Sequence, residues 1–530
     1  MYHFKSKSIL FLILCLFNLS VAHTQTMGLL KNTIDAYPGY TLFSKAGLTY
    51  LINNTGEVVH TWSNNTNTTH PGYLAENGDL FVVSRGIKRL DWQGNVIWRY
   101  VNPQAHHDAA IMPNGNVLLL VSGAKTNAEV IAAGRDPSLV SDNIDPMVVY
   151  EINPQGEIVW QWHVWDHLIQ DFDASKDNYG IVENHPELVD INFTRNDSPD
   201  WLHGNAINYN AELDQILLSP RFNSEIWIID HSTTTEQAAS HSGGNANKGG
   251  DLLYRWGNPI AYRAGTLDDQ KLFGSHDAQW IKEGFPGAGN IIIYNNGGTN
   301  YGRDGNYSTI DEITPPLNGF NYEKNDDEAF APINTTWSYS ESPVENFYSS
   351  FISGVQRLEN GNTLIDEGEN GRLFEVKNTG EIVWEYQNSV TNSSVTAQGD
   401  PRPDAPQPSL FRANKYDPEF IESLNLPLIN SGPIELYNSQ SLITLMANET
   451  EVSVTPGLGQ FSYGTGQLVT IHAMDSAEYE FSHWSIISGE VSIDNPDTAY
   501  TTLTIQSTEA EIQANYNTFD DLIFLSGFDD

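Results

Sequence analysis

The chain has 530 residues, which is enough for two or three domains with a large apolar core. Its 67 acidic and 26 basic residues give a formal net charge of −41, which argues against nucleic acid or an anionic membrane surface as the partner. An anionic substrate would therefore need a site that supplies its own local positive charge.

The first 22 residues have the pattern of a secretory signal peptide. Lys5 and Lys7 precede the apolar run ILFLILCLFNL, and Ala22 stands where a signal peptidase would cut. The run is too short for a resident membrane span, so no membrane insertion is expected. We therefore expect a mature protein that is secreted or periplasmic. The single cysteine, Cys15, lies in this run, so the mature protein would have neither a disulfide nor a cysteine-based site.

The sequence after the signal repeats one unit five times. Each copy starts seven residues before a turn residue, continues with an apolar strand, and adds third and fourth strands such as MVVYEINP and GEIVW. Four short strands joined by Asn-Gly-type turns are typical of a propeller blade. The copies begin at His70, His107, His203, His276 and Ser353.

A sixth blade is split between the two ends of this region. Residues 40–62 supply three strands, and residues 409–416 can supply the missing one. A blade that draws strands from both ends closes a ring and leaves no free sheet edge. We therefore predict an all-β fold: a six-bladed β-propeller over residues 35–417 with split-blade ring closure, followed by a small C-terminal β domain.

In a propeller blade the first strand lines the central channel, so the first residues of the five copies should meet at one mouth of that channel. Asn205 lies two residues after His203 and should face the same way, because side chains alternate along a strand. Arg221 and Arg85 each end a second strand near that mouth. Imidazoles, an amide and a guanidinium predict a site for a small oxyanion such as phosphate, sulfate or carboxylate. Asp108 and Asp277 point away from their histidines and are interpreted as structural.

Three segments resemble the bacterial arylsulfate sulfotransferases, six-bladed enzymes that need no nucleotide sulfate donor. They are DWLHGNAINYN…ILLSPRFNSEIWIID, GSHDAQWI and SSFISGVQRLENGNTL, and the resemblance covers residues 35–417. It implies that His276 attacks the sulfuryl group and carries it as a sulfohistidine. It also implies that the sulfate is surrounded by Arg221, His203, Asn205 and His107.

Three further residues complete the predicted site. The threonine that supplies a hydroxyl ligand in the family has no clear match here, and Ser353 or Ser350 can take its place. His106 adjoins His107 but is one residue out of phase with the repeat; it is kept as a substrate-binding candidate. No metal and no cofactor are expected.

The residue types suit sulfuryl transfer from an aryl sulfate donor to a phenolic acceptor. Charge spreads over three equatorial oxygens, so catalysis is mostly positioning and charge stabilisation. A neutral imidazole is a good nucleophile, and its adduct passes the group on in ping-pong kinetics. His203 can protonate the departing phenolate and then deprotonate the acceptor. Imidazoles crowded beside a guanidinium should have pKa values below about 6.5, so activity should fall on acidification.

The C-terminal part is predicted to carry no chemistry. Residues 418–448, which carry Pro427 and Pro433, are interpreted as a linker, residues 449–516 as a small β module, and residues 517–530 as an acidic tail. The stretch GTGQLVTIHA…YEFSHWS resembles the β-grasp-like repeats of bacterial surface proteins, which implies spacing or cell-surface attachment. The sequence also leaves a homodimer open.

Two other functions stay open at this point. One is a secreted, non-catalytic propeller that binds a glycan or a protein on the face with the long loops. The other is an aryl sulfatase on the same fold, which releases sulfate to water. Turnover of an aryl sulfate, with and without a phenol, separates these functions from the transferase.

Overall fold

The computed structural model describes residues 25–63, 71–140, 143–193, 199–325, 328–476 and 478–518. The predicted signal peptide with Cys15, the first-copy residue His70, and all but the first two residues of the predicted tail lie outside this part. None of the helices in the described part combines the length and apolarity needed to cross a bilayer.

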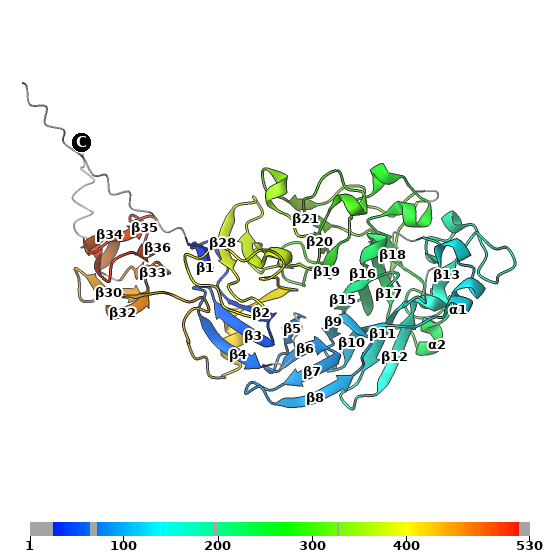
Figure 1. Ribbon diagram of the computed structural model, residues 1–530, viewed down its shortest axis with the longest axis horizontal. Coiled ribbons are helices and arrows are strands. Elements are labelled where there is room, and N and C mark those ends of the chain that lie inside the picture. Colours follow the sequence, from blue (N-terminus) through cyan, green and yellow to red (C-terminus); the bar gives the residue numbers. More distant parts are fainter. Residues whose placement is uncertain are drawn as a thin grey trace, which may run out of the picture.

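The described residues 28–416 are dominated by β-structure and contain six antiparallel sheets of four or five strands (Figure 1). In hydrogen-bonded order the first three are sheet 1, β29 (Ala413–Tyr416), β2 (Tyr40–Lys45), β3 (Leu48–Asn53) and β4 (Val58–Ser63); sheet 2, β5 (Gly72–Leu74), β6 (Leu80–Ser84), β7 (Gly86–Leu90) and β8 (Val96–Val101); and sheet 3, β9 (Ala105–Ile111), β10 (Val117–Ser122), β11 (Met147–Ile152) and β12 (Ile158–His163). The others are sheet 4, β15 (Gly204–Asn210), β16 (Gln215–Pro220), β17 (Ile226–Asp230) and β18 (Tyr254–Trp256); sheet 5, β19 (His276–Trp280), β20 (Ile291–Asn295), β21 (Thr309–Ile313) and β24 (Trp337–Tyr339); and sheet 6, β25 (Gly354–Arg357), β26 (Thr363–Glu367), β27 (Arg372–Val376), β28 (Ile382–Gln387) and β1 (Gly28–Asn32).

Sheet 1 combines strands from both ends of this region. β29 pairs with β2 in a register that runs from Tyr40 opposite Tyr416 to Phe43 opposite Ala413. The predicted pairing of the two ends of the chain is therefore present. Sheet 6 has a strand that the sequence did not predict, because β1 lies before the predicted propeller start at residue 35 and pairs with β28.

Apolar runs and glycine turns explain the hairpins. The residues VLLLV of β10 are all buried, as expected for a strand with neighbours on both faces. The Asn114–Gly115 turn precedes this strand. Gly115 has a φ of +85°, a left-handed conformation that glycine adopts without steric cost.

Hydrophobic clusters fill the spaces between neighbouring sheets. One cluster lies between each of the pairs 1 and 2, 2 and 3, 3 and 4, 4 and 5, and 5 and 6. Another joins sheets 6 and 1, where Trp384 and Tyr386 of β28 pack with Phe43 of β2. Indole rings such as Trp384 thus serve as packing between sheets.

The first strands of the sheets contact one another near the middle of this region. β5, β9, β15 and β19 lie inside, whereas β4, β8 and β12 lie toward the outside (Figure 1). Contacts connect β2 with β5, β6 with β9, β9 with β15, β15 with β19, β19 with β25, and β25 with β29. The starts of the repeat copies are therefore brought close together.

The connections contain the remaining short elements. The helices of the described part are α1 (Asn127–Ala132), α2 (Thr235–Ala238) and α3 (Pro418–Ser423), and the 3₁₀ turns are η1 (Pro137–Leu139), η2 (Val164–His167), η3 (Val182–Asn184), η4 (Arg221–Asn223), η5 (Pro259–Tyr262), η6 (Leu267–Asp269), η7 (Thr299–Tyr301), η8 (Val344–Asn346) and η9 (Gly368–Asn370). Two small ladders pair β13 (Leu168–Ile169) with β14 (Val189–Asp190), and β22 (Leu317–Asn318) with β23 (Asn321–Tyr322).

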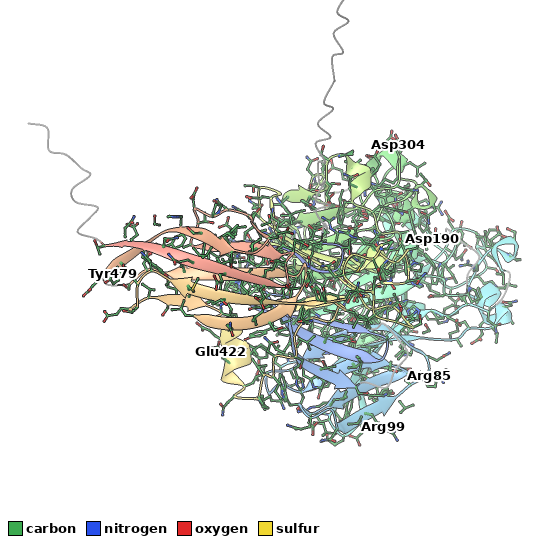
Figure 2. All side chains as sticks on the ribbon, turned by 60° about the vertical axis from the view of Figure 1, so that its left-hand side comes forward. Arg85, Arg99, Asp190, Asp304, Glu422 and Tyr479 are labelled. Carbon is green, nitrogen blue, oxygen red and sulfur yellow. The ribbon has the colours of Figure 1, made fainter. Side chains whose placement is uncertain are left out.

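The C-terminal module consists of two four-stranded sheets with one shared core. The first sheet has β32 (Gly459–Gly464), β30 (Gln440–Ala447), β37 (Glu509–Thr518) and β34 (Tyr479–Ser488), and the second β31 (Ser453–Thr455), β33 (Leu468–Met474), β36 (Tyr500–Ile505) and β35 (Val491–Ile493). Tyr479 lies at the end of the module that is farthest from the six sheets (Figure 2).

A helix and a strand lie within residues 418–448, which the sequence predicted to be a linker. Residues 418–423 form α3, and β30 is an inner strand of the module, paired in parallel with β37. Alternating burial in QSLITLMA explains this strand, because its apolar side chains enter the module core. The module meets the six sheets at β1, where the Asn32 amide donates to the Thr470 hydroxyl over 3.1 Å.

Candidate active site

The described copies of the repeat bend the backbone at the same place. His107, His203 and Ser353 have φ values of +55°, +51° and +95°, and Asp277, directly after His276, has +50°. Such left-handed conformations cost a residue with a Cβ roughly 1–2 kcal/mol. The ladders also shift register beside these residues in sheets 3, 4 and 5. Bulges of this kind re-aim side chains next to functional sites.

Three histidines and one aspartate form a continuous polar cluster. The Nε2 atoms of His107 and His203 are 3.1 Å apart. His203 donates from Nδ1 to Asp200 in a short hydrogen bond. His106 donates from Nδ1 to the Gly204 carbonyl over 3.0 Å, and its Nε2 lies 3.3 Å from Asp200. The structure therefore brings the predicted residues His106, His107 and His203 together.

His276 begins β19 and is buried, with 2% of its surface exposed. Its Nδ1 lies 2.6 Å from Oδ1 of Asn296. The Asn296 amide donates to the carbonyls of Ser349 and Ile352, so Oδ1 is the acceptor for the imidazole N–H. This arrangement puts the His276 lone pair on Nε2, where the Ile352 amide N–H approaches to 3.2 Å.

Arg221 supplies the positive charge of the site. It begins η4, directly after β16, and its amide donates to the His203 carbonyl over 3.2 Å. One guanidinium nitrogen, Nη2, donates to the Ser350 carbonyl over 3.1 Å, while buried Nε has no hydrogen-bond partner among the described residues. The guanidinium also lies 5.5 Å from the Tyr301 ring centroid.

Asn205 is buried beside this cluster. Its side-chain N–H donates to the Ser275 carbonyl over 2.9 Å and so links sheet 4 to sheet 5. Its Oδ1 is buried and has no partner within the described residues. An unpaired buried amide oxygen is costly, which is typical of a group that meets a ligand.

The two candidate serines have different environments. The Ser353 hydroxyl donates to the Ser349 hydroxyl over 2.9 Å and accepts from the Gly368 amide over 3.0 Å. Ser350 accepts from Arg221 through its carbonyl, and its amide donates to Glu369 over 2.7 Å. Ser353 is thus occupied by the fold, whereas Ser350 lies beside the guanidinium.

A buried ion cluster centred on Arg412 lies next to the histidines, and sequence reasoning missed it. Arg412 directly precedes β29; its Nη1 donates to Asp108 over 2.7 Å, and its Nε lies 3.0 Å from Asp277. Tyr73 also donates to Asp108. Burial raises the pKa of the Asp277 carboxyl to about 6, and it raises the pKa of Asp366 well above its usual range. The two aspartates predicted to be structural are therefore bound to one arginine.

The expected lowering of imidazole pKa values is found for two histidines and is wrong for a third. Burial and the neighbouring Arg221 lower the pKa of His276 well below 6.5. Burial also lowers the pKa of His203, against the opposing effect of Asp200. Burial acts in the same direction on His106, but its contact with Asp200 outweighs burial and raises the pKa. Asp200 is correspondingly held as a carboxylate by hydrogen bonds that outweigh its burial.

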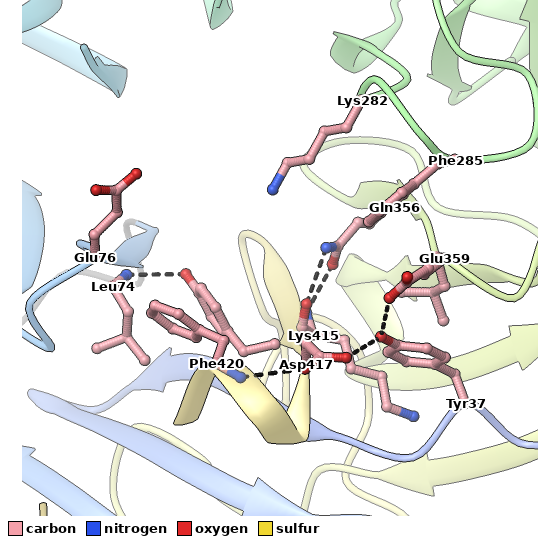
Figure 3. A pocket seen from close by; sticks show the side chains of 12 residues that line it. Tyr37, Leu74, Glu76, Lys282, Phe285, Gln356, Glu359, Lys415, Asp417 and Phe420 are labelled. Atoms are coloured by element: carbon pink, nitrogen blue, oxygen red, sulfur yellow. Dashed lines mark hydrogen bonds between the residues drawn. The ribbon is translucent and has the colours of Figure 1, made fainter. Parts of the chain in front are cut away.

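The cavities distinguish the two ends of the inner strands. A cavity of about 10 Å³ beside His106, His203 and Asp200 has room for about one water. A larger cavity of about 270 Å³ lies at the opposite ends of β5, β19 and β25, with Lys282 pointing into it (Figure 3). None of the predicted site residues lines the larger cavity.

Asp200, Asn296 and Arg412 are the site residues that sequence reasoning did not find. Asp200 had a signal, because it stands three residues before His203 in the quoted stretch DWLHGN. Asn296 and Arg412 lie outside the repeated positions and carry no local signal. Arg85, an exposed residue on the surface in Figure 2, has no contact with the histidines among the described residues.

Two family models match the chain. One, described as arylsulfotransferase (ASST), matches residues 24–402, and one described as a divergent InlB B-repeat domain matches residues 443–519. The curated protein "Arylsulfate sulfotransferase AssT" of Escherichia coli O6:H1 (strain CFT073) is 24% identical over 319 residues, which are 54% of this chain. The match covers 49% of that protein, so it spans about half of the relative's length.

Two solved structures that match this chain have lower sequence identity to it than the curated relative has. A protein of unknown function from Bacteroides caccae is 14% identical, with a TM-score of 0.38 over 66% of this chain and 94% of that chain. The Cps50 (Swd1) β-propeller domain of Myceliophteria thermophila is 11% identical, with a TM-score of 0.32 over 68% and 89%.

Proposed function

Because the chain belongs to the arylsulfotransferase family, we propose that it transfers a sulfuryl group from an aryl sulfate to a phenol through a sulfohistidine at His276. One observation carries this proposal: a buried imidazole has its Nε2 lone pair fixed by Asn296 and is coupled electrostatically to Arg221. Burial keeps this imidazole neutral, which is the form that attacks sulfur.

The fold that supports this site is proposed to be a closed six-bladed propeller. The cycle of core clusters and inner-strand contacts through sheets 1 to 6 supports closure, and the β2–β29 ladder is the split blade. The catalytic domain then extends over residues 35–417, with β1 added at its outer edge, and the C-terminal module spaces or attaches it.

The first half-reaction forms the N–S bond and breaks the S–O bond to the aryl group. The His276 Nε2 lone pair attacks sulfur, and the electron pair of the breaking bond leaves with the phenolate oxygen. His203 holds at Nε2 the proton that it took from the acceptor phenol of the previous turnover and gives it to the phenolate, while Asp200 stabilises its imidazolium form. The Ile352 N–H, which lies 3.2 Å from Nε2, turns to a sulfuryl oxygen as the lone pair is consumed.

The second half-reaction reverses these roles with a new phenol. The acceptor oxygen attacks sulfur and gives its proton to His203, and the N–S bond returns its electron pair to His276. Arg221 compensates the charge on the sulfuryl oxygens in both halves through the guanidinium edge that includes the unpaired Nε. The residues that surround the group are His107, His106, Ser350, Ser353 and Asn205 through its side-chain oxygen. The Ser353 hydroxyl is held by the Ser349 hydroxyl and the Gly368 amide.

Colour release from 4-nitrophenyl sulfate tests the proposal. Phenol-dependent release of 4-nitrophenol, with an equal amount of phenyl sulfate formed, is the expected result. Release that needs no phenol would support the aryl sulfatase instead. No release under either condition would favour the non-catalytic glycan- or protein-binding propeller and overturn the proposal.

The rate should decline on acidification only below a pH of about 6.5. The pKa of His276 is lowered in the folded protein, so the imidazole stays neutral through the neutral range and gains its inhibitory proton only at lower pH. Because 4-nitrophenolate is stable enough to leave without a proton from His203, we expect a flat kcat/KM for 4-nitrophenyl sulfate above that pH and an acid limb below it. Intrinsic fluorescence over the same range separates protonation from unfolding. A rate that rises steadily down to a pH of about 5 contradicts the assignment.

Arg221→Ala should lower kcat by about 10²–10³-fold, the usual loss for one transition-state donor. Because Arg221 also lowers the pKa of His276, the acid limb should move to higher pH in this variant. Arg221→Lys should recover part of the rate by restoring the charge without the planar fork. The exposed Arg85→Ala is the matched control and should keep the wild-type profile. If the acid limb of Arg221→Ala stays at the wild-type pH, the guanidinium does not lower the pKa of His276.

The proposed location is secreted or periplasmic, and the proposed partners are the aryl sulfate donor and the phenolic acceptor. The acidic net charge of −41 fits neither nucleic acid nor anionic lipid. Surface attachment through the C-terminal module and a homodimer are further parts of this proposal.

A further inference from the structure

Two histidines and one aspartate, residue types that serve as metal ligands, lie close together between sheets 3 and 4, away from the proposed active site. His167 ends η2, which follows β12 of sheet 3. His241 belongs to the connection 231–253 between β17 and β18, and Asp251 lies near the end of that connection. One ligand atom from each residue lies within 4.8 Å of the others.

The contacts aim two imidazoles at one carboxylate oxygen. His167 Nδ1 lies 2.8 Å from Asp251 Oδ1, and His241 Nδ1 lies 2.7 Å from the same atom. The two rings are nearly perpendicular, at 87°, so they approach that oxygen from different directions. Nitrogen and oxygen donors that converge on one point from separate elements are the arrangement of a transition-metal site.

The surroundings of His167 fix which nitrogen faces the carboxylate. The residue is buried, its ring is parallel to that of Trp162, and its Nε2 donates to the Ala238 carbonyl over 2.8 Å. Metal-binding histidines usually donate their second N–H to a backbone carbonyl or carboxylate in this way. The backbone at Gly250 lies so close that a Cβ there would be 2.6 Å from His167 Nε2.

We propose that His167 Nδ1, His241 Nδ1 and Asp251 Oδ1 bind one Zn²⁺ ion that clips the β17–β18 connection to η2. Bonds of about 2.0–2.1 Å in a tetrahedral site place neighbouring donor atoms roughly 3.3 Å apart, so a small opening of the observed contacts admits the ion. The His241 side chain is 63% exposed, which leaves the fourth position to water. The ion thus ties two neighbouring sheets together.

His106, His107 and His203 also lie close together and form a second histidine group. These three residues belong to the proposed active site, so they serve as the comparison group for the zinc test.

The test uses the full chain, stripped of metal with a chelator and titrated with zinc chloride in a calorimeter. Wild type should bind one equivalent of Zn²⁺. His241→Ala and Asp251→Asn should weaken binding by at least the roughly 10–100-fold that loss of a supporting residue costs such sites. His241 is exposed, so its removal leaves the core intact, and circular dichroism checks the fold. Zinc should raise the melting temperature of wild type and not of His241→Ala.

Two control variants assign the binding to this group. His185→Ala removes a partly exposed histidine from the pocket wall that His241 also lines, and it should bind zinc as wild type does. His107→Ala removes one imidazole from the group of His106, His107 and His203, and it should also keep full zinc binding. Wild type without bound zinc, wild-type affinity in His241→Ala, or loss of binding in His107→Ala alone overturns the proposal. The outcome does not depend on sulfuryl transfer.

Discussion

Replacement of His276 by alanine should abolish sulfuryl transfer, with a loss of at least about 10⁴-fold in kcat. In the proposed mechanism this imidazole forms the covalent intermediate, Arg221 has no lone pair that could replace it, and His203 is assigned to proton transfer. The measurement is phenol-dependent turnover of 4-nitrophenyl sulfate. In parallel, mass spectrometry of wild type quenched without an acceptor should find one added sulfuryl group on the peptide that contains His276.

His163→Ala is the control for loss of a histidine from another sheet, since His163 ends β12 of sheet 3 and is only partly exposed. It should turn over and form the adduct as wild type does. Circular dichroism and thermal melting verify that the His276 variant is folded. If folded His276→Ala keeps more than about a tenth of the wild-type rate, the covalent route through this residue is wrong.

Arg412→Met should lower the free energy of unfolding by about 3–5 kcal/mol, because it removes one partner from a buried ion cluster. Asp108 and Asp277 then keep their burial but lose the guanidinium that both contact. The loss should be smaller at a pH near 5 than near 8, because protonation of the Asp277 carboxyl, whose pKa burial raises to about 6, relieves part of the stranded charge. Urea unfolding at the two pH values measures both effects.

The control is Arg89→Met, which breaks a pair with Asp79 at 2.6 Å whose arginine side chain is 34% exposed. Solvent screening limits the contribution of such a pair to about 0–1 kcal/mol. A similar loss in the two variants would mean that the Arg412 cluster adds nothing beyond a surface pair. Equal losses at both pH values would exclude charge stranding as the cause.

Repeat spacing predicted much of the site because each sheet places its first strand inside. The seven-residue offset identified His107, His203 and His276 without any contact information, and the pairing of residues 409–416 with the N-terminal strands was also readable. The same offset says nothing about residues that approach from loops. Asn296 reaches His276 from the end of β20, and Arg412 reaches Asp108 across more than 300 residues of sequence.

Local electrostatics limited the prediction further. A general argument from crowded imidazoles gave the correct pKa direction for His203 and His276 but failed for His106, because Asp200 contacts it directly. The sequence analysis also missed two strands: β1, which adds to sheet 6, and β30, which lies inside the predicted linker. β1 pairs with β28 and β30 pairs in parallel with β37, so each has a partner far away in the sequence that only the folded sheets identify.

The position of Arg412 beside β29 sets an order for biogenesis. Both the last strand of sheet 1 and the cation that neutralises Asp108 and Asp277 come from residues 412–416, near the end of the six-sheet region. A nascent chain that has not yet supplied this segment therefore has an incomplete sheet 1 and two buried aspartates without the cation that both contact. Sheet 1 and the buried ion cluster can be completed only after residues 412–416 have been synthesised.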